Sequence, residues 1–189
     1  MKRYMLLRFN VLLACLSLVA VPLFADASVP GSWMFSERKK ETVSRMDFAA
    51  RFMHEIGEDN KDVEYITVGP EMMQKVEEYM NENKADDNGA SAVIPHVKSV
   101  RLVRVATGGD KYHEKASGLL HKNTNRYVFS VGDTLMTDGG GIQMWTRRRG
   151  RTIVELVVLT LSADGRFELI DLTGIMDEEI LKNLTKMHL

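Results

Sequence analysis

The chain has 189 residues, with 25 Lys and Arg against 26 Asp and Glu, so its formal net charge at pH 7 is −1. This nearly neutral balance argues against nucleic-acid binding, which normally requires a strongly basic surface. The single cysteine, Cys15, excludes an intramolecular disulfide and leaves the rest of the chain without a thiol nucleophile or a thiolate metal ligand.

The first 27 residues have the three parts of a secretory signal peptide. A basic segment, 1–8, is followed by the apolar run 11–24 and by Ala-Asp-Ala at 25–27, which is typical of a cleavage site. The apolar run has 14 residues, and spanning a membrane takes about 20. We therefore expect export through the Sec pathway and cleavage after Ala27, rather than a membrane anchor.

Cys15 offers an alternative, because Leu12–Cys15 resembles the box in which a bacterial lipoprotein is lipidated on its cysteine. The apolar run continues for nine residues beyond Cys15, whereas a lipidated cysteine normally ends it, so we favour a periplasmic or secreted protein. Removal of residues 1–27 leaves 22 basic and 25 acidic residues, a net charge of −3. The remaining chain has no apolar stretch long enough to span a membrane, and its roughly 160 residues suffice for one hydrophobic core.

The mature chain is predicted to begin with an irregular lead-in, 28–43, followed by a single domain, 44–189. A helix is expected to start at Ser44, which can form a capping box with Asp47, and to stop at Gly57. After it, the predicted elements are a strand at 63–68, a helix after Gly69-Pro70, a polar loop at 81–91, a strand at 97–106, a helix capped by Asp110 and a strand at 126–131.

The C-terminal part is predicted to be a meander of three strands and a closing helix. The strands are expected at 142–147, 152–162 and 167–173, with a two-residue hairpin turn within 163–166. Asp177 is expected to cap the last helix.

This order of elements predicts an α+β fold, in which a mostly antiparallel sheet packs against helices. The strand at 152–162 is apolar on both faces except for Glu155 and its threonines. We therefore expect it to be central, with its second face covered by the lead-in around Trp33 or by another protein.

Residues 139–151 combine three glycines with the basic segment RRRGR, but they do not form a phosphate-binding loop. Such a loop needs glycines between a strand and a helix, whereas these precede an alternating, strand-like segment. We expect a hairpin with a solvent-exposed basic tip, which is a candidate interaction surface. Its residues are Trp145, Arg147, Arg148, Arg149 and Arg151.

A weaker candidate ligand site lies where glycines do separate a strand from a helix. It consists of Gly108, Gly109 and His113, and it lacks the lysine and hydroxyl residues of a nucleotide site. The five histidines are widely spaced and no HExxH or GxSxG motif is present. We therefore assign no catalytic residue, no metal ligand and no cofactor.

The pattern of elements resembles the Bacteroidota family known as domain of unknown function 4252. The resemblance covers residues 47–184 and rests on the segments KDVEYITVGPEMMQKV and VKSVRLVRVA and on the block Glu155–Gly174. It implies a small exported or lipid-anchored protein of the cell envelope, without established activity or known catalytic residues. It also implies a genetic link to extracytoplasmic sigma factors and hence to envelope stress or regulation.

Two functions follow from these observations. The preferred one is a non-enzymatic envelope protein that contacts a protein partner or another copy of itself, through an exposed sheet face or the tip at 147–151. The alternative is a periplasmic small-ligand binder or hydrolase with a site near Gly108–His113.

Overall fold

The computed structural model describes residues 47–57, 60–83, 90–129, 135–137 and 140–188. Among these residues, the centre of the fold is a seven-stranded sheet in which every strand pair is antiparallel. The strands are β1 (Val63–Val68), β2 (Val97–Val105), β3 (Val128–Phe129), β4 (Leu135–Thr137), β5 (Gly140–Arg149), β6 (Thr152–Leu161) and β7 (Phe167–Met176). The helices are α2 (Phe48–Ile56), α3 (Pro70–Asn83), α4 (Ala90–Val93), the 3-10 helix η2 (Ile94–His96), α5 (Asp110–His121) and α6 (Glu178–His188).

The predicted α+β fold is confirmed. The strand order is β1-β2-β7-β6-β5-β3, and β4 also pairs with β5. The C-terminal meander of β5, β6 and β7 is followed by the closing helix α6, as expected. The predicted signal peptide at 1–27, the lead-in at 28–43 and Ser44 lie outside the described residues.

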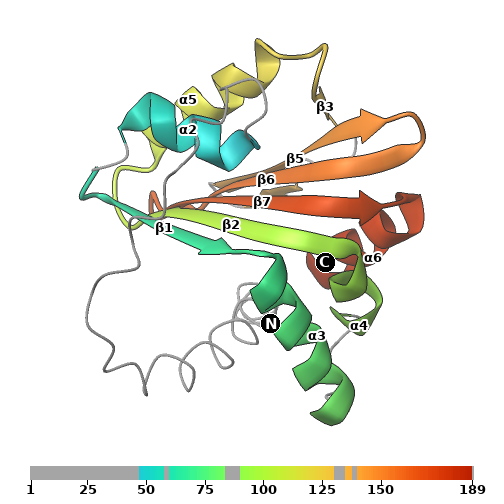
Figure 1. Ribbon diagram of the computed structural model, residues 1–189. Coiled ribbons are helices and arrows are strands. Elements are labelled where there is room, and N and C mark those ends of the chain that lie inside the picture. Colours follow the sequence, from blue (N-terminus) through green and yellow to red (C-terminus); the bar gives the residue numbers. More distant parts are fainter. Residues whose placement is uncertain (1–46, 58–59, 84–89, 130–134, 138–139, 189) are drawn as a thin grey trace, which may run out of the picture.

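Helices cover the sheet on both faces (Figure 1). On one face, α2 and α5 pack on a core cluster that includes Val157 and Leu159 of β6. On the other face, α3, α4, η2 and α6 pack on a second cluster that includes Leu156 and Val158. Alternate residues of one strand point to opposite faces, so the apolar sequence of β6 serves two cores. The cover therefore comes from helices of the chain itself, and the expected exposed sheet face is not found among the described residues.

The connection between β6 and β7 is one residue longer than predicted. The backbone N–H of Gly165 donates to the oxygen of Ser162 (2.9 Å), and the N–H of Ser162 donates to the oxygen of Arg166 (2.9 Å). Gly165 has a φ of +79°, in the left-handed region that glycine adopts without strain. Residues 163–165 thus form a three-residue hairpin loop. In this loop type a tight turn is followed by a residue in the left-handed conformation, and that residue is Gly165.

The start of α6 agrees with the prediction, and the starts of α5 and α2 differ from it. Asp177 caps α6, since its Oδ1 accepts hydrogen bonds from the N–H groups of Glu179 (3.0 Å) and Ile180 (2.9 Å). Asp110 was predicted to cap α5, but it is the first helical residue and the N-cap is Gly109. The helix expected to start at Ser44 begins at Phe48, because Asp47 is the N-cap of α2 and accepts from the N–H of Ala50 (3.0 Å).

Candidate functional site

The N-terminus of α2 rests on two buried carboxyl groups of the central strands. Glu155 in β6 and Asp171 in β7 are 0% and 1% exposed. The N–H of Phe48 donates to Glu155 Oε1 (2.6 Å), and the N–H of Ala49 donates to Asp171 Oδ2 (2.7 Å). The first N–H groups of a helix lack partners within the helix and carry partial positive charge, so carboxyl oxygens stabilise this end.

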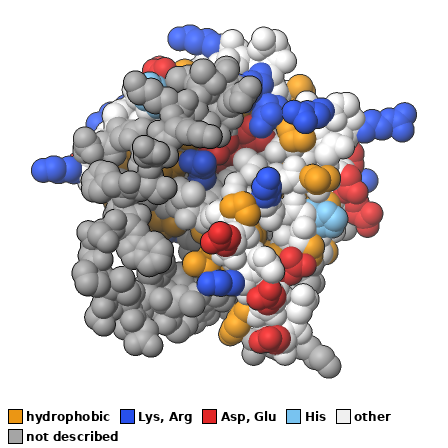
Figure 2. Space-filling model, viewed as in Figure 1, with side chains coloured by type: hydrophobic (Ala, Val, Ile, Leu, Met, Phe, Trp, Pro, Cys, Tyr) orange, Lys and Arg blue, Asp and Glu red, His pale blue; other side chains and the backbone are white. Residues whose placement is uncertain are grey.

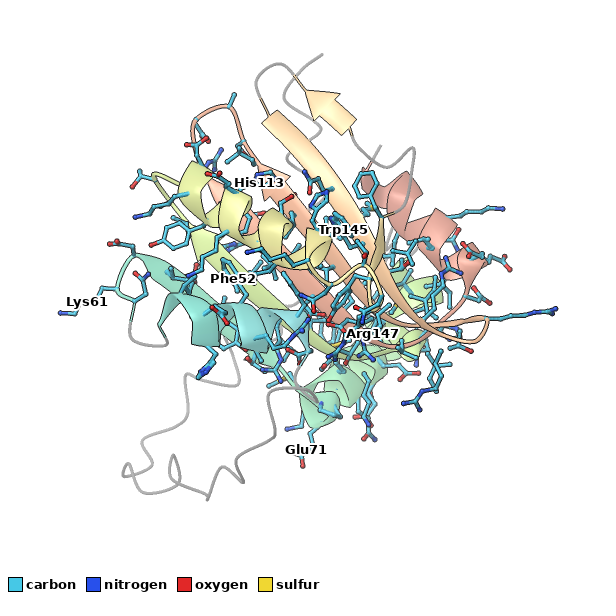
Figure 3. All side chains as sticks on the ribbon, turned by 90° about the horizontal axis from the view of Figure 1, so that it is seen from above. Phe52, Lys61, Glu71, His113, Trp145 and Arg147 are labelled. Atoms are coloured by element: carbon cyan, nitrogen blue, oxygen red, sulfur yellow. The ribbon has the colours of Figure 1, made fainter. Side chains whose placement is uncertain are left out.

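Two arginines complete this acid cluster from the neighbouring strands. Arg147 in β5 is the cross-strand partner of Glu155, and its Nε donates to Glu155 Oε2. Arg101 in β2 is the cross-strand partner of Asp171 and forms an ion pair with Asp47 (2.7 Å between Nε and Oδ2). Figure 3 shows Arg147 beside the N-terminal end of α2. The acid cluster therefore joins four adjacent strands and one helix end through Asp47, Glu155, Asp171, Arg101 and Arg147.

A tyrosine and a third arginine close one side of the acid cluster. Tyr127 is completely buried, and its hydroxyl donates to Glu155 Oε1 (3.0 Å) while it accepts from Arg51 Nη2 (2.9 Å). Burial and the charge of Glu155 raise the pKa of Tyr127. The hydroxyl therefore stays neutral and serves as a hydrogen-bond donor to the carboxylate.

Asp171 is a buried carboxyl group whose pKa is raised. Burial raises the pKa of Asp171 well above its ordinary value, and the negative charges of Glu155 and Asp47 raise it further. The N–H of Ala49 and the charge of Arg101 act in the opposite direction. Oδ1 of Asp171 has no hydrogen-bond partner among the described residues, so no donor stabilises a negative charge on this oxygen there.

This arrangement stabilises the fold but leaves no open face for a substrate. The backbone of α2 occupies the acceptor oxygens of both buried carboxyl groups, and Arg147 takes the second oxygen of Glu155. Neither Glu155, an exception in an apolar strand, nor Asp171 was predicted to be a site residue. A charged residue inside an otherwise apolar strand was the signal that could have identified both.

The structure divides the predicted basic tip into paired and unpaired arginines. Arg147 points toward Glu155, and Arg148 pairs with Glu178 at the start of α6. Arg149 and Arg151 flank Gly150, whose φ of +61° makes the turn, and both are exposed without an ion-pair partner among the described residues.

Trp145 does not lie on this tip. Its side chain is 2% exposed and packs edge-on against the rings of His121 (4.8 Å between centroids) and Phe129 (4.9 Å). Trp145 is therefore part of the core beneath α5 and is not accessible as a stacking surface.

The glycines of the weaker candidate site are used for packing. The N–H of Gly109 donates to the oxygen of Gly165 in the β6–β7 turn (2.8 Å). A Cβ atom on Gly109 would lie 2.6 Å from Phe167 Cβ and 2.7 Å from the oxygen of Gly165. Gly108 has a φ of +67°. The two glycines thus allow the start of α5 to contact the turn.

His113 follows on α5 (Figure 3), and its side chain is half-buried. Its ring packs edge-on against Phe167, 6.1 Å between centroids. Burial lowers the pKa of His113, and the charge of Asp110 partly opposes this. Among the described residues, no group of three His, Cys, Asp or Glu side chains could hold a metal ion.

The chain matches the family model described as "Domain of unknown function (DUF4252)" over residues 54–184. The protein belongs to this family. The match includes β1 to β7 and with them Glu155, Asp171, Arg101 and Arg147 of the acid cluster. No curated protein and no solved structure matches the chain. Within the described part of the chain, no helix is both long and apolar enough to span a membrane.

Proposed function

We propose that this DUF4252 protein is an exported, non-enzymatic protein of the cell envelope that acts by contact with another protein. The observation that supports this proposal most directly is an exposed surface at one end of the sheet. It consists of Arg149, Arg151 and Ile175, and is called the hairpin surface below. Ile175 is 73% exposed, more than any other large hydrophobic residue that the structure describes.

The register of the sheet brings these three residues to the same end. Arg149 is paired with Thr152 across the β5–β6 hairpin, and Ile153 is paired with Met176 of β7. Ile175 therefore lies at the end of β7 that adjoins the hairpin turn. The β5–β6 hairpin ends at one side of the molecule (Figure 1), and Lys or Arg side chains project on that side (Figure 2).

Arginine and an exposed apolar side chain at the same end of a sheet form a combination that favours protein contact. Arginine is enriched at the centres of protein interfaces, where its charge and its alkyl stem both contribute. A single exposed isoleucine would need no explanation, but here it lies at the same end of the sheet as two exposed arginines that have no ion-pair partner among the described residues. We infer that the partner presents acidic side chains around an apolar contact.

Export is supported by the signal-peptide pattern of residues 1–27. The resemblance to envelope proteins linked to sigma factors favours a role in the envelope-stress response. The alternative of a ligand or hydrolase site near Gly108–His113 has less support. Gly109 contacts the β6–β7 turn and the His113 ring packs on Phe167.

The test is site-specific photo-crosslinking in the native envelope. A photoreactive phenylalanine at position 151 is expected to give one discrete crosslinked protein, and the same residue at Glu114, exposed on α5, is expected to give none. Arg149→Glu with Ile175→Ser should abolish the crosslink from position 151. Equal crosslinking from positions 151 and 114, or none from 151, would refute the proposal. Mass spectrometry of the sample also shows whether the mature chain starts at Ser28 or at a lipidated Cys15.

A further inference from the structure

The outer edge of β1 offers a second, independent surface for association. Among the described residues, β1 pairs only with β2, in an unbroken register from Val63 to Val68. Residues 64–67 are all exposed, and Tyr65 and Ile66 are 37% and 39% exposed. Apart from Glu64, the strand contains none of the prolines, charged side chains or bulges by which natural proteins protect an edge from pairing. The opposite edge has only β3 and β4, of two and three residues.

We propose that two copies of this chain associate through their β1 strands, which pair antiparallel about a two-fold axis at Ile66. The two seven-stranded sheets would then form one continuous sheet. This inference goes beyond the proposed function and does not depend on the hairpin surface, which lies at a different part of the sheet.

The geometry of a continuous sheet restricts the register of the two β1 strands. If the two-fold axis is perpendicular to the sheet, both copies have their corresponding faces on the same side, and the residue at the axis pairs with the same residue of the other copy. Near the middle of β1 this residue is Tyr65 or Ile66. Tyr65 is the cross-strand partner of Val103, on the face covered by α2. Ile66 is the partner of Leu102, on the face covered by α3.

The side chains favour the register centred on Ile66. The hydroxyl of Tyr65 already accepts a hydrogen bond from Arg101 (2.7 Å), whereas Ile66 is apolar and gains from burial against its copy. In this register Glu64 is opposite Val68, so no like charges oppose each other within the strand.

Opposite charges at the two ends of β1 support an antiparallel pair of copies. Lys61, in the turn before the strand, and Glu71, at the start of α3 after it, are both exposed (Figure 3). In an antiparallel pair, the end of β1 that adjoins Lys61 in one copy lies beside the end that adjoins Glu71 in the other, so opposite charges come near each other at both ends of the interface.

Single-cysteine crosslinking tests the register directly. In the full chain with Cys15→Ser, Ile66→Cys is expected to form an intermolecular disulfide. Residues directly opposite in an antiparallel pair have Cα atoms about 4.5–5.5 Å apart, within reach of a disulfide. The control is Glu64→Cys, in which the two cysteines would be four residues out of register. At about 3.3 Å per residue, this separation is too large for a disulfide. Absence of a disulfide at position 66, or equal crosslinking at position 64, would overturn the proposal.

Light scattering after size-exclusion chromatography measures the association itself. The unmodified protein is expected to be a dimer, and Ile66→Lys should weaken dimerisation by about tenfold or more, because lysine at an edge disfavours strand pairing. Circular dichroism should show an unchanged fold, since position 66 is exposed. Arg149→Glu with Ile175→Ser should remain dimeric, which separates this proposal from the proposed function. A monomer at every concentration of the unmodified protein would refute the dimer.

Discussion

The backbone N–H of Phe48 donates a hydrogen bond to the buried carboxylate of Glu155, 107 residues further along the chain. This contact fixes the start of α2 over the middle of the sheet. Arg147 and Tyr127 bind the same carboxylate, so Glu155 connects a helix, two strands and the segment before β3. The acid cluster is therefore the site at which substitutions should have the largest effect on stability.

Replacing Glu155 by alanine is expected to destabilise the protein by about 3–5 kcal/mol, the usual cost of removing one partner from a buried ion pair. The reason is that Arg147 loses its counter-ion and the N–H of Phe48 loses its acceptor. Urea unfolding measures the change. Glu114→Ala, on the exposed face of α5, is the matched control and should change stability by less than about 0.5 kcal/mol. Equal effects of the two substitutions would show that the acid cluster does not stabilise the fold.

The raised pKa of Asp171 makes stability depend on pH. Its pKa is raised in the folded protein, so above the ordinary aspartate value of about 3.9 the unfolded chain loses this proton while the folded chain keeps it. The contribution of Asp171 to stability is therefore fully present at low pH and decreases as the pH rises toward the raised pKa.

Asp171→Asn is expected to remove this pH dependence, since asparagine cannot ionise and can still accept from the N–H of Ala49. The free energy of unfolding, measured in urea at a series of pH values, should vary less with pH in the variant than in the unmodified protein. Identical pH profiles would contradict a raised pKa of Asp171.

The half-buried His113 should contribute a pH dependence of the opposite sign. Burial lowers its pKa, so below about pH 6.5, the ordinary value, the unfolded chain takes up a proton that the folded chain resists. This part of the stability is present above pH 6.5 and is lost as the pH falls. NMR titration of the ring protons should give a pKa below the ordinary value, and His113→Gln should lower the acid sensitivity. A pKa at or above the ordinary value would refute this prediction.

Gly109→Ala is expected to destabilise the protein by about 1–3 kcal/mol, as other substitutions do that force atoms into a packed site. The new methyl group would meet the backbone of the β6–β7 turn and Phe167 Cβ. Gly118→Ala in the same helix is the control, because a Cβ atom there meets nothing within 4 Å. In a helix interior it should instead stabilise by about 0.5–1 kcal/mol. Thermal unfolding of both variants distinguishes the outcomes, and a neutral Gly109→Ala would contradict the close contact.

Much of the local structure could be predicted because its determinants are close together in sequence. Asp177 caps α6 through residues two and three positions away, and the glycines at 150 and 165 supply the turns of two hairpins. Predictions failed where the deciding contact is distant in sequence. Aspartate is a common N-cap, but the contact between Gly109 and the distant β6–β7 turn places the cap of α5 at Gly109 instead.

The tip and the sheet faces show where sequence reasoning was insufficient. Four arginines close to one turn appeared equivalent, yet Arg147 lies opposite Glu155 in the sheet and Arg148 reaches Glu178 of α6. The apolar faces of β6 indicated that both faces are covered. The second cover was expected from the lead-in around Trp33 or from another protein, whereas helices of the chain pack on both faces. In both cases the missing information was the position of elements far away in the chain.

The fold class, the C-terminal meander and the positions of most helices and strands follow from the sequence alone, because periodicity, caps and turn residues act over a few residues. It is the three-dimensional structure that shows that Glu155 and Asp171 receive the N-terminus of α2, that Trp145 is buried and that the edge of β1 is exposed. These features depend on strand pairing and helix packing between distant segments. The partners of a carboxylate in a strand lie on other strands and helices, so they depend on how the whole sheet is assembled.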